Sequence, residues 1–283
     1  MSLVKVSIYI PAFNAEKTIK KTIISVQNQS YKFDEIIIID DNSNDSTNKI
    51  LKKFKNIKII KNETNRGLGY NRNLGIKLSQ NDIVASIDAD VVLDPKWLEI
   101  MIQNFEKNNE TMFGGKMTEK LLINKFNKWR AKYYSQNWGD KDVDNPPFLY
   151  GCNTIQHKSV WKFLNGYNEK LLTNGEDIDY SKRIQKSQKF KIKYCSKALS
   201  EHLQDDDLDT LSKRIWRYHS FGYKIKEPSV YKTIKISIKQ FKFFLNRSIK
   251  DLIKLDFEFI YINFLVFIKF ILLEHRYYKN YKK

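Results

Sequence analysis

Four consecutive isoleucines at residues 36–39 place the strongest constraint on the fold of this chain. A continuous β-branched run is typical of a strand covered on both faces, as in a parallel sheet with helices on either side. Residues 4–94 alternate such short runs with stretches that carry apolar residues at helical spacing. This alternation predicts parallel βαβ units with right-handed crossovers.

The same patterns predict most elements of the chain. Expected strands are residues 4–10, 36–39, 57–60, 83–87, 148–156 and 190–194, and expected helices are residues 15–29, 46–54, 68–78, 95–106, 126–134, 159–163, 175–186 and 208–223. Apart from the 126–134 helix, residues 111–150 are irregular and include a long polar loop. In parallel sheets ligands bind outside the carboxyl ends of the strands, so the Asp-rich and Gly-rich loops of the first half are expected at one edge.

The strand at residues 83–87 ends in two carboxylates, Asp88 and Asp90, which are separated by one small residue. Such a pair at the carboxyl end of a buried strand can bind a divalent cation, and the cation can hold a pyrophosphate. For an isolated motif, the simpler interpretation is that Asp88 ends the strand and Asp90 caps the following segment. The choice depends on what the rest of the chain supplies.

The charge of the chain limits the classes of partner. Its formal net charge is +18 at pH 7 and its pI is near 9.6, which favours nucleic acid, anionic lipid or phosphorylated small substrates. No zinc finger, RRM signature or other basic nucleic-acid-binding motif is recognisable in the sequence. The two cysteines, Cys152 and Cys195, have no CxxC spacing, so we interpret both as reduced and structural. The N-terminus does not resemble a signal peptide, and a cytoplasmic location is expected.

Residues 229–283 differ in composition from the rest, with 12 Lys and Arg against four Asp and Glu. Within them, residues 257–273 are almost all apolar or aromatic, interrupted by Glu258, Asn263 and Lys269. A spanning helix needs about 20 apolar residues with few charges. An extension that lies on an anionic membrane surface is favoured; a helix that packs on the domain or forms an oligomer, and a spanning helix, are the alternatives.

Five motifs in order resemble the motif set of the family 2 glycosyltransferases. They are Ile-Pro-Ala-Phe-Asn at 10–14, Asp-Asp-Asn-Ser-Asn-Asp-Ser-Thr at 40–47, Asn-Arg-Gly at 65–67, Asp-Ala-Asp at 88–90 and Gly-Glu-Asp at 175–177. The resemblance covers about residues 4–222. It implies an α/β fold of the GT-A type, a Rossmann-like, mostly parallel central sheet flanked by helices, here with a C-terminal helical extension.

The resemblance also implies a domain division and a function. Residues 1–228 would form the GT-A domain, with a nucleotide-binding half at 1–94 and an acceptor-binding half at 95–228, and residues 229–283 the basic, aromatic-rich extension. The implied activity is inverting transfer of a hexosyl or N-acetylhexosaminyl group from a UDP-sugar to a surface-glycan or lipid-linked acceptor, with Mn²⁺ or Mg²⁺ as cofactor. The implied location is the inner face of the membrane, as a peripheral protein active in cell-surface polysaccharide biosynthesis. A basic nucleic-acid-binding protein and a non-catalytic member of the same fold are the alternatives; the sugar, the acceptor and the oligomeric state stay open.

Roles in donor and metal binding follow from the matching positions. By resemblance, Asp90 binds the metal and Asp88 contacts the ribose or a metal-bound water. His202 corresponds to a third metal ligand of some family members, although a single histidine is more often not a ligand. Asp41 would accept a hydrogen bond from the uracil N3–H, while Asp40 orders the loop.

The remaining roles concern catalysis and anion binding. By resemblance Asp177 is the general base, and Glu176 orients it or binds the acceptor; both would also complement a helix N-terminus. Donor-binding residues are expected from the first strand and the Gly-rich loop, and residues that contact a donor or acceptor phosphate are expected on the 208–223 helix. These residues are Pro11, Phe13, Arg66 and Arg72 for the donor, and Arg214 and Arg217 for the phosphate.

Overall fold

The protein, as a computed structural model, is described at residues 4–105, 111–172, 174–220 and 229–281. It forms two compact units. The first consists of residues 1–120 and 135–204, and the second of residues 121–134 and 205–283. The units do not follow the predicted boundary at residue 228, because the helix that precedes this boundary belongs to the second unit. The functional division at residues 94 and 228 stays a prediction.

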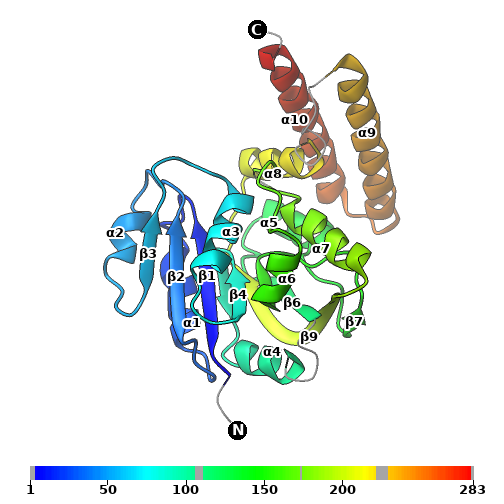
Figure 1. Ribbon diagram of the computed structural model, residues 1–283. Helices are drawn as coiled ribbons and strands as arrows, with labels where there is room; N and C mark the ends of the chain where they lie inside the picture. The colour runs from blue at the N-terminus through cyan, green and yellow to red at the C-terminus, as the bar shows by residue number, and fades with distance from the viewer. Residues whose placement is uncertain (1–3, 106–110, 173, 221–228, 282–283) are drawn as a thin grey trace. The chain divides into compact units, whose positions relative to one another are not determined.

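The described part of the first unit is built on one nine-stranded sheet (Figure 1). Its strand order is β3-β2-β1-β4-β8-β6-β9-β5, and β7 pairs with β9. Strands β3, β2, β1 and β4 are parallel, β8 lies antiparallel between β4 and β6, and β6 is parallel to β9. The strands are β1 Val6–Ala12, β2 Glu35–Asp40, β3 Lys58–Lys61, β4 Ile83–Ile87, β5 Val91–Leu93, β6 Thr111–Glu119, β7 Val143–Asp144, β8 Asn153–His157 and β9 Lys191–His202.

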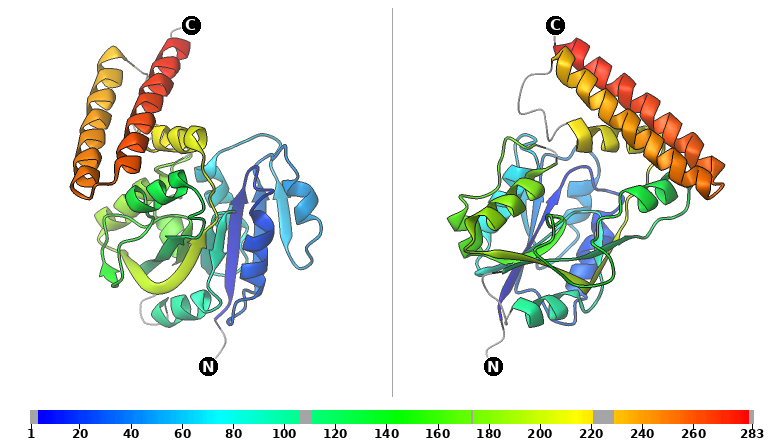
Figure 2. Two further views of the ribbon diagram at one scale, coloured as in Figure 1. Left: turned by 180° about the vertical axis from the view of Figure 1, so that it is seen from behind. Right: turned by 90° about the vertical axis from the view of Figure 1, so that its right-hand side faces the viewer.

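Helices cover both faces of this sheet (Figure 2). Side chains of successive strand residues point to opposite faces, so Ile38 packs with α1 and α4 while Ile37 packs in the second core with α3 and α7. The isoleucine run is therefore buried on both sides, and the predicted α/β fold class is confirmed. The helices of this unit are α1 Ile19–Gln27, α2 Thr47–Leu51, α3 Leu68–Leu78, α4 Trp97–Phe105, α6 Lys158–Phe163 and α7 Glu176–Ser187.

Three predictions about strands are wrong. Residues 111–119 form β6 where an irregular segment was expected, and β9 runs to His202, well past the predicted end at residue 194. The strand expected at residues 148–156 begins only at Asn153, as β8. Strands β6 and β9 pair in parallel, with a register shift between Gly115 and Lys116. Consecutive glycines have no strand propensity of their own, but here a Cβ on Gly115 would lie 2.5 Å from the Ala198 carbonyl oxygen. Close approach of the neighbouring strand explains why the sequence pattern does not reveal β6.

The second unit is helical, as predicted for the extension, and its members are α5 Lys125–Tyr133, α8 Leu208–Ser220, α9 Val230–Ile253 and α10 Phe257–Tyr281. Helices α9 and α10 lie side by side as a hairpin (Figures 1 and 2). The polar residue within the apolar run of α10 has a structural reason, because Asn263 accepts a hydrogen bond from the Trp129 indole at 2.8 Å and donates one to Asp251 at 2.7 Å.

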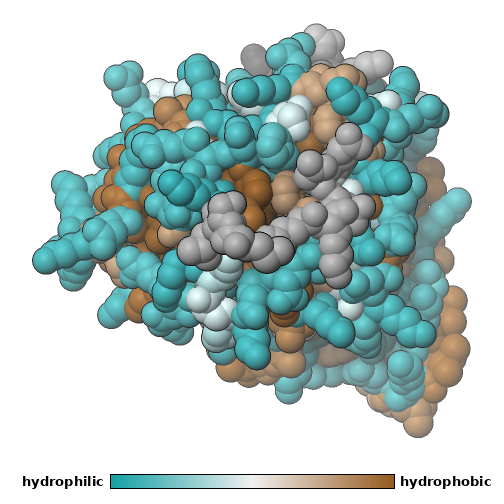
Figure 3. All heavy atoms as spheres, turned by 60° about the horizontal axis from the view of Figure 1, so that its bottom comes forward, coloured by the Kyte–Doolittle hydropathy of each residue, from teal (hydrophilic) through white to brown (hydrophobic). Residues whose placement is uncertain are grey.

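Within the described residues, no helix combines the length and apolar character that a membrane crossing requires. The face drawn in Figure 3 is covered mainly by hydrophilic side chains, between which apolar patches remain visible.

Candidate active site

The loop after β2 is tied to the loop before α3 by the Asp41 carboxylate. Its two oxygens accept hydrogen bonds from the backbone amides of Arg66 at 2.8 Å and Gly67 at 3.0 Å, and from the side chain of Asn62 at 2.7 Å. Asp40 accepts from the amide of Ser43 at 2.9 Å, in keeping with its expected role. Both aspartates thus order loops at this edge of the sheet, and the contact between Asp41 and uracil stays a prediction.

Gly67 lets this loop approach the segment that precedes α7. Its φ is +83°, and a Cβ at this position would lie 2.5 Å from the carbonyl oxygen of Leu172. The amide of Leu68 donates to the same carbonyl at 2.8 Å. Arg66, which precedes Gly67, is exposed, and its guanidinium lies 4.4 Å from the centre of the Tyr70 ring.

The end of β1 contributes two residues with different surroundings. Pro11 is buried within the strand, whereas the Phe13 ring is 49% exposed just past its end. Phe13 is thereby accessible to a ligand at the carboxyl edge of the sheet, as a donor-binding residue must be.

Arg72 is buried, and it connects two of the predicted motifs. Its guanidinium forms ion pairs at 3.1 Å with Asp88 and with Glu176, and it donates hydrogen bonds at 2.8 Å to the Ser86 hydroxyl and the Gly151 carbonyl. From the sequence, this arginine was expected to contact a phosphate or a base edge, and that contact stays a prediction. In the structure its charge is matched by two carboxylates, one directly after β4 and one on α7.

The two acidic residues at the start of α7 differ in accessibility. Asp177 is partly exposed, and its carboxylate accepts from the amides of Gly151 at 3.1 Å and Ile178 at 2.7 Å. Burial raises the pKa of Asp177. Glu176 is fully buried beside Arg72, and burial followed by the charge of Asp177 raises its pKa to about 7. Of the pair, Asp177 is the carboxylate that an acceptor can reach.

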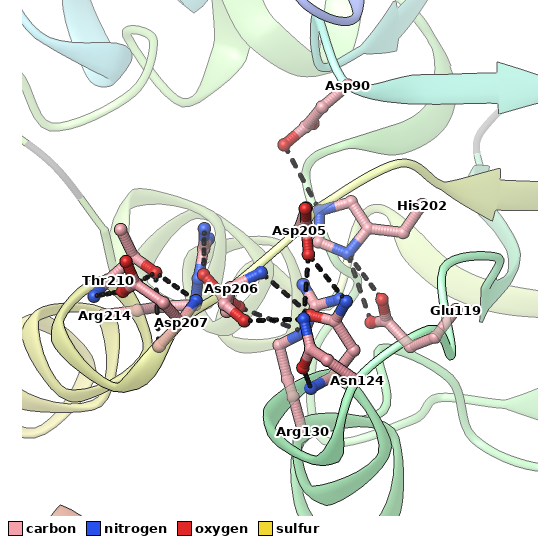
Figure 4. A network of polar contacts seen from close by, with 11 residues as sticks. Asp90, Glu119, Asn124, Arg130, His202, Asp205, Asp206, Asp207, Thr210 and Arg214 are labelled. Atoms are coloured by element: carbon pink, nitrogen blue, oxygen red, sulfur yellow. Dashed lines mark hydrogen bonds and ion pairs between the residues drawn. The ribbon is translucent and has the colours of Figure 1, made fainter.

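Asp90, His202 and Glu119 form a chain of polar contacts (Figure 4). His202 Nε2 lies 3.3 Å from Asp90 Oδ2, and His202 Nδ1 lies 3.1 Å from both oxygens of Glu119. The antiparallel pairing of β5 with β9, which sets Val91 opposite His202, brings the histidine to this place. Burial alone would lower the pKa of His202, but the carboxylates of Asp90 and Glu119 together raise it to about 9.

Glu119 was missed by the sequence analysis. It is the last residue of β6, a strand that was not predicted because its sequence contains two consecutive glycines. Recognition of that strand, with Glu119 opposite His202 in the β6–β9 register, is the signal that would have found it.

The side chains near Asp90 partly fit the coordination of a divalent cation. Among the described residues, no three His, Cys, Asp or Glu side chains converge on one point. Asp90 and His202 do lie together, and the side chains of Asp88 and Asp90 are 30% and 28% exposed. A histidine whose second nitrogen is held by a carboxylate, as Glu119 holds His202, is the usual arrangement of a metal-binding imidazole. The chemistry at Asp90 and His202 therefore fits a metal, with Asp88 turned to Arg72.

Arg214 and Arg217 belong to α8 in the second unit. Arg214 lies 3.4 Å from the buried carboxylate of Asp206, which is also 3.3 Å from Arg130 (Figure 4). Burial, and then the charge of Arg214, lower the pKa of Arg217. The structure thus gives Arg214 an ion pair within the unit, and contact of either arginine with a phosphate stays a prediction.

Comparison with protein families matches residues 7–164 of the chain to "Glycosyl transferase family 2". Three relatives illustrate the range. An uncharacterized glycosyltransferase of Haemophilus influenzae is 30% identical over 62% of this chain and 57% of its own length. A poly-beta-1,6-N-acetyl-D-glucosamine synthase of Staphylococcus epidermidis is 29% identical over 81% of this chain and 57% of its own. A UDP-Glc:alpha-D-GlcNAc-diphosphoundecaprenol beta-1,3-glucosyltransferase of Escherichia coli is 32% identical over 43% of this chain and 50% of its own.

The chain spans 57% of the length of the first two of these relatives. Among solved structures, residues 1–349 of TarS from S. aureus superpose with a TM-score of 0.58 at 17% identity, covering 98% of this chain and 92% of that one. TarS has also been solved with UDP and with UDP-GlcNAc. GalNAc-T7 with UDP, GalNAc and Mn²⁺ superposes with a TM-score of 0.58 at 16% identity, over 89% of this chain and 57% of that one.

Proposed function

Because the chain belongs to glycosyl transferase family 2, we propose that it is a metal-dependent, inverting transferase that uses a UDP-sugar. The donated group is a hexosyl or N-acetylhexosaminyl residue, and the acceptor is a hydroxyl of a surface glycan or a lipid-linked saccharide. The observation that carries this proposal is the bridge of Arg72 between Asp88 and Glu176, at 3.1 Å to each. It holds the motif proposed for donor and metal next to the motif proposed for the base.

The proposed donor and acceptor are based on the similar structures and relatives described above. TarS has been solved with UDP-GlcNAc, and GalNAc-T7 with UDP and Mn²⁺. The names of relatives specify an acceptor carried by diphosphoundecaprenol in one case and poly(ribitol-phosphate) in another. These names support a nucleotide sugar with a uracil base and an acceptor that belongs to a cell-surface polymer or its lipid-linked precursor.

In the proposed reaction, the acceptor oxygen bonds to the anomeric carbon as the bond from that carbon to the UDP oxygen breaks. Asp177 takes the proton of the attacking hydroxyl. Its carboxylate is oriented by the amides of Gly151 and Ile178, and these amides at the N-terminus of α7 offset part of the rise in pKa that burial causes. Glu176 does not act as the general base in place of Asp177, since its ion pair with Arg72 keeps it buried.

Asp90 and His202 are the proposed ligands of a Mn²⁺ or Mg²⁺ ion, with Asp88 near the ribose. When bound, the ion would neutralise charge on the leaving diphosphate. Glu119 keeps the His202 ring in one orientation by its contacts with Nδ1, and leaves Nε2 directed toward Asp90.

A thermal-shift panel tests the proposal. A ligand that binds only the folded state raises the melting temperature, by an amount that grows with its affinity. We expect UDP with Mn²⁺ to stabilise the protein, GDP and CMP with Mn²⁺ to do so far less, and the Mn²⁺-dependent part to vanish in Asp90→Ala. Equal shifts with all three nucleotides, or shifts that do not depend on the metal, would contradict it.

A further inference from the structure

The helix hairpin of α9 and α10 presents apolar side chains to solvent along both helices. On α9 they recur every three or four residues, which keeps them on one side of the helix; they are Ile234, Ile238, Phe241, Leu245, Ile249 and Leu252, each 42–57% exposed. On α10 the same spacing links Phe257, Tyr261, Phe264, Ile268 and Leu272, each 39–65% exposed.

The two stripes form one continuous face. Phe241 and Phe244 of α9 lie 5.7 and 5.3 Å from the Phe267 ring of α10, measured between ring centres, and Phe244 lies 6.5 Å from Phe264. Exposed members of both stripes, Phe241 and Phe264, therefore belong to the same aromatic seam. We call the combined surface the hairpin face.

Cations line the α9 edge of the hairpin face. Lys235, Lys239 and Lys242 are exposed, and each directly follows an exposed apolar residue of α9. One step along a helix turns by about 100°, so these lysines lie beside the stripe and do not interrupt it. The lysine edge is the one away from α10, because Phe244, which contacts α10, lies on the opposite side of the stripe.

The other edge, on α10, carries charges of both signs. Lys269 follows Ile268 on α10 and, with Lys213 of α8 and Arg276, lines a hollow of about 250 Å³ that includes Leu272 of the stripe. Asp209 of the same hollow pairs with Lys269, and Glu258, which follows Phe257 of the stripe, is exposed. On α9 the single acidic residue, Asp251, is buried. The hairpin face is thus apolar in the middle and cationic along its α9 edge.

We propose that the hairpin face lies on an anionic lipid bilayer, with its apolar side chains in the headgroup–acyl boundary and the lysine edge of α9 at lipid phosphates. Amphipathic helices with this division of residues bind membrane interfaces in the plane of the bilayer. A second copy is a poorer occupant, because the partner's α9 has no exposed acidic residue and its α10 only Glu258 to set against the three lysines of α9. The inference is independent of the proposed function, and would place a transferase where lipid-linked acceptors are found.

Co-sedimentation of the full chain with vesicles tests this proposal. Wild-type protein should pellet with vesicles of phosphatidylcholine and phosphatidylglycerol, and much less with phosphatidylcholine alone. The triple change Lys235→Gln, Lys239→Gln and Lys242→Gln should weaken binding by roughly fivefold per lysine. The matched control changes three exposed lysines of the first unit, Lys52, Lys53 and Lys55, to Gln and should pellet like wild type.

The apolar part of the face is tested by Ile238→Gln combined with Leu245→Gln, which should abolish pelleting while the helical circular dichroism is kept. The proposal is overturned if wild type does not pellet with anionic vesicles, or if the control loses as much binding as the lysine variant. It is also overturned if wild type is a dimer in solution that ignores vesicles and is made monomeric by the glutamine pair. UDP-dependent stabilisation is measured on the same variants and should be unchanged, so failure of membrane binding and failure of the proposed function are distinguishable.

Discussion

Arg72 shows how one buried side chain organises a site whose parts are far apart in sequence. Its ion pairs reach Asp88, 16 residues away, and Glu176, 104 residues away. Removing one member of a buried, paired set leaves uncompensated charge, which costs about 3–5 kcal/mol. We expect Arg72→Met to lower the free energy of unfolding in urea by that amount.

Arg66→Met is the control, since Arg66 is exposed and rests on the Tyr70 ring. Its effect on the unfolding free energy should stay within about 1 kcal/mol. Equal losses in the two variants would contradict the internal role of Arg72.

The proposed role of His202 as a metal ligand predicts that the affinity for the metal depends on pH. In the protein without metal its pKa is about 9, so the ring is charged at pH 7. A metal must displace this proton, and the affinity for Mn²⁺ should therefore rise up to about tenfold per pH unit between pH 7 and 9. Calorimetric titration with Mn²⁺ at pH 7 and pH 8 measures this, and His202→Gln should show weak binding without that slope. An equal Kd for wild type at both pH values would argue against His202 as a ligand.

The folding stability of the metal-free protein also depends on the protonation of His202. The folded-state pKa of His202 is raised above its ordinary value of 6.5. Its contribution to stability is accordingly complete below about pH 6.5 and is lost as the pH rises through 9. Over that range the melting temperature should fall more in wild type than in His202→Gln.

At the level of single residues, the sequence predicted which residues gather at the site better than it predicted which side chains contact each other. Asp90 and His202, which the resemblance assigned to one metal, lie 3.3 Å apart. The inward turn of Arg72 could not be predicted, because it depends on a carboxylate more than a hundred residues away and on the space beside Gly151, where a Cβ would lie 2.9 Å from the guanidinium. The same holds for Glu119, whose partner is on another strand.

Among the elements, the loop before α3 has the strictest requirement for a particular residue, a glycine at position 67. Gly67 and Gly139 both have a positive φ, +83° and +101°, but only at Gly67 does a neighbouring backbone atom lie within 4 Å of an added Cβ. Gly139→Ala should cost about 1–2 kcal/mol for backbone conformation alone. Gly67→Ala should cost distinctly more, because the methyl group would overlap the Leu172 carbonyl.

Urea unfolding of both glycine variants separates the two contributions. The excess loss in Gly67→Ala reports the contact between the α3 loop and the segment before α7. Indistinguishable losses would show that this loop can move away from Leu172 at little cost, against the packing described.

Elements with a strong local pattern were predicted well, and α3 has the predicted bounds of residues 68 and 78. The parallel half of the sheet follows from the isoleucine run and its alternation with amphipathic helices. Strand β6 and the second half of β9 depend on pairing with each other, which local propensity does not contain. In the extension, the apolar run of α10 was visible in the sequence, whereas α9 was foreseen only as part of a helical segment.

At the scale of the whole molecule, the family was predictable because five short motifs occur in a fixed order, although each alone is weak. The net charge of +18 was compatible with several partners. The structure adds where part of that charge lies, along the α9 edge of an apolar hairpin face. That arrangement favours a lipid surface over nucleic acid, since the apolar stripe has no counterpart on a phosphate backbone.

The most direct test of the account is release of UDP from UDP-sugars, with UDP-glucose and UDP-GlcNAc as first donors, in the presence of Mn²⁺ and acceptor lipid extract. A general base contributes about 10²–10⁴-fold, so Asp177→Asn should lose turnover by that factor while it keeps UDP-dependent thermal stabilisation. Asp179→Asn, which alters a surface pair with Arg183 on the same helix, should retain wild-type turnover, and Asp90→Ala should lose its response to Mn²⁺. Full turnover in Asp177→Asn and Asp90→Ala would contradict the assignment of the site.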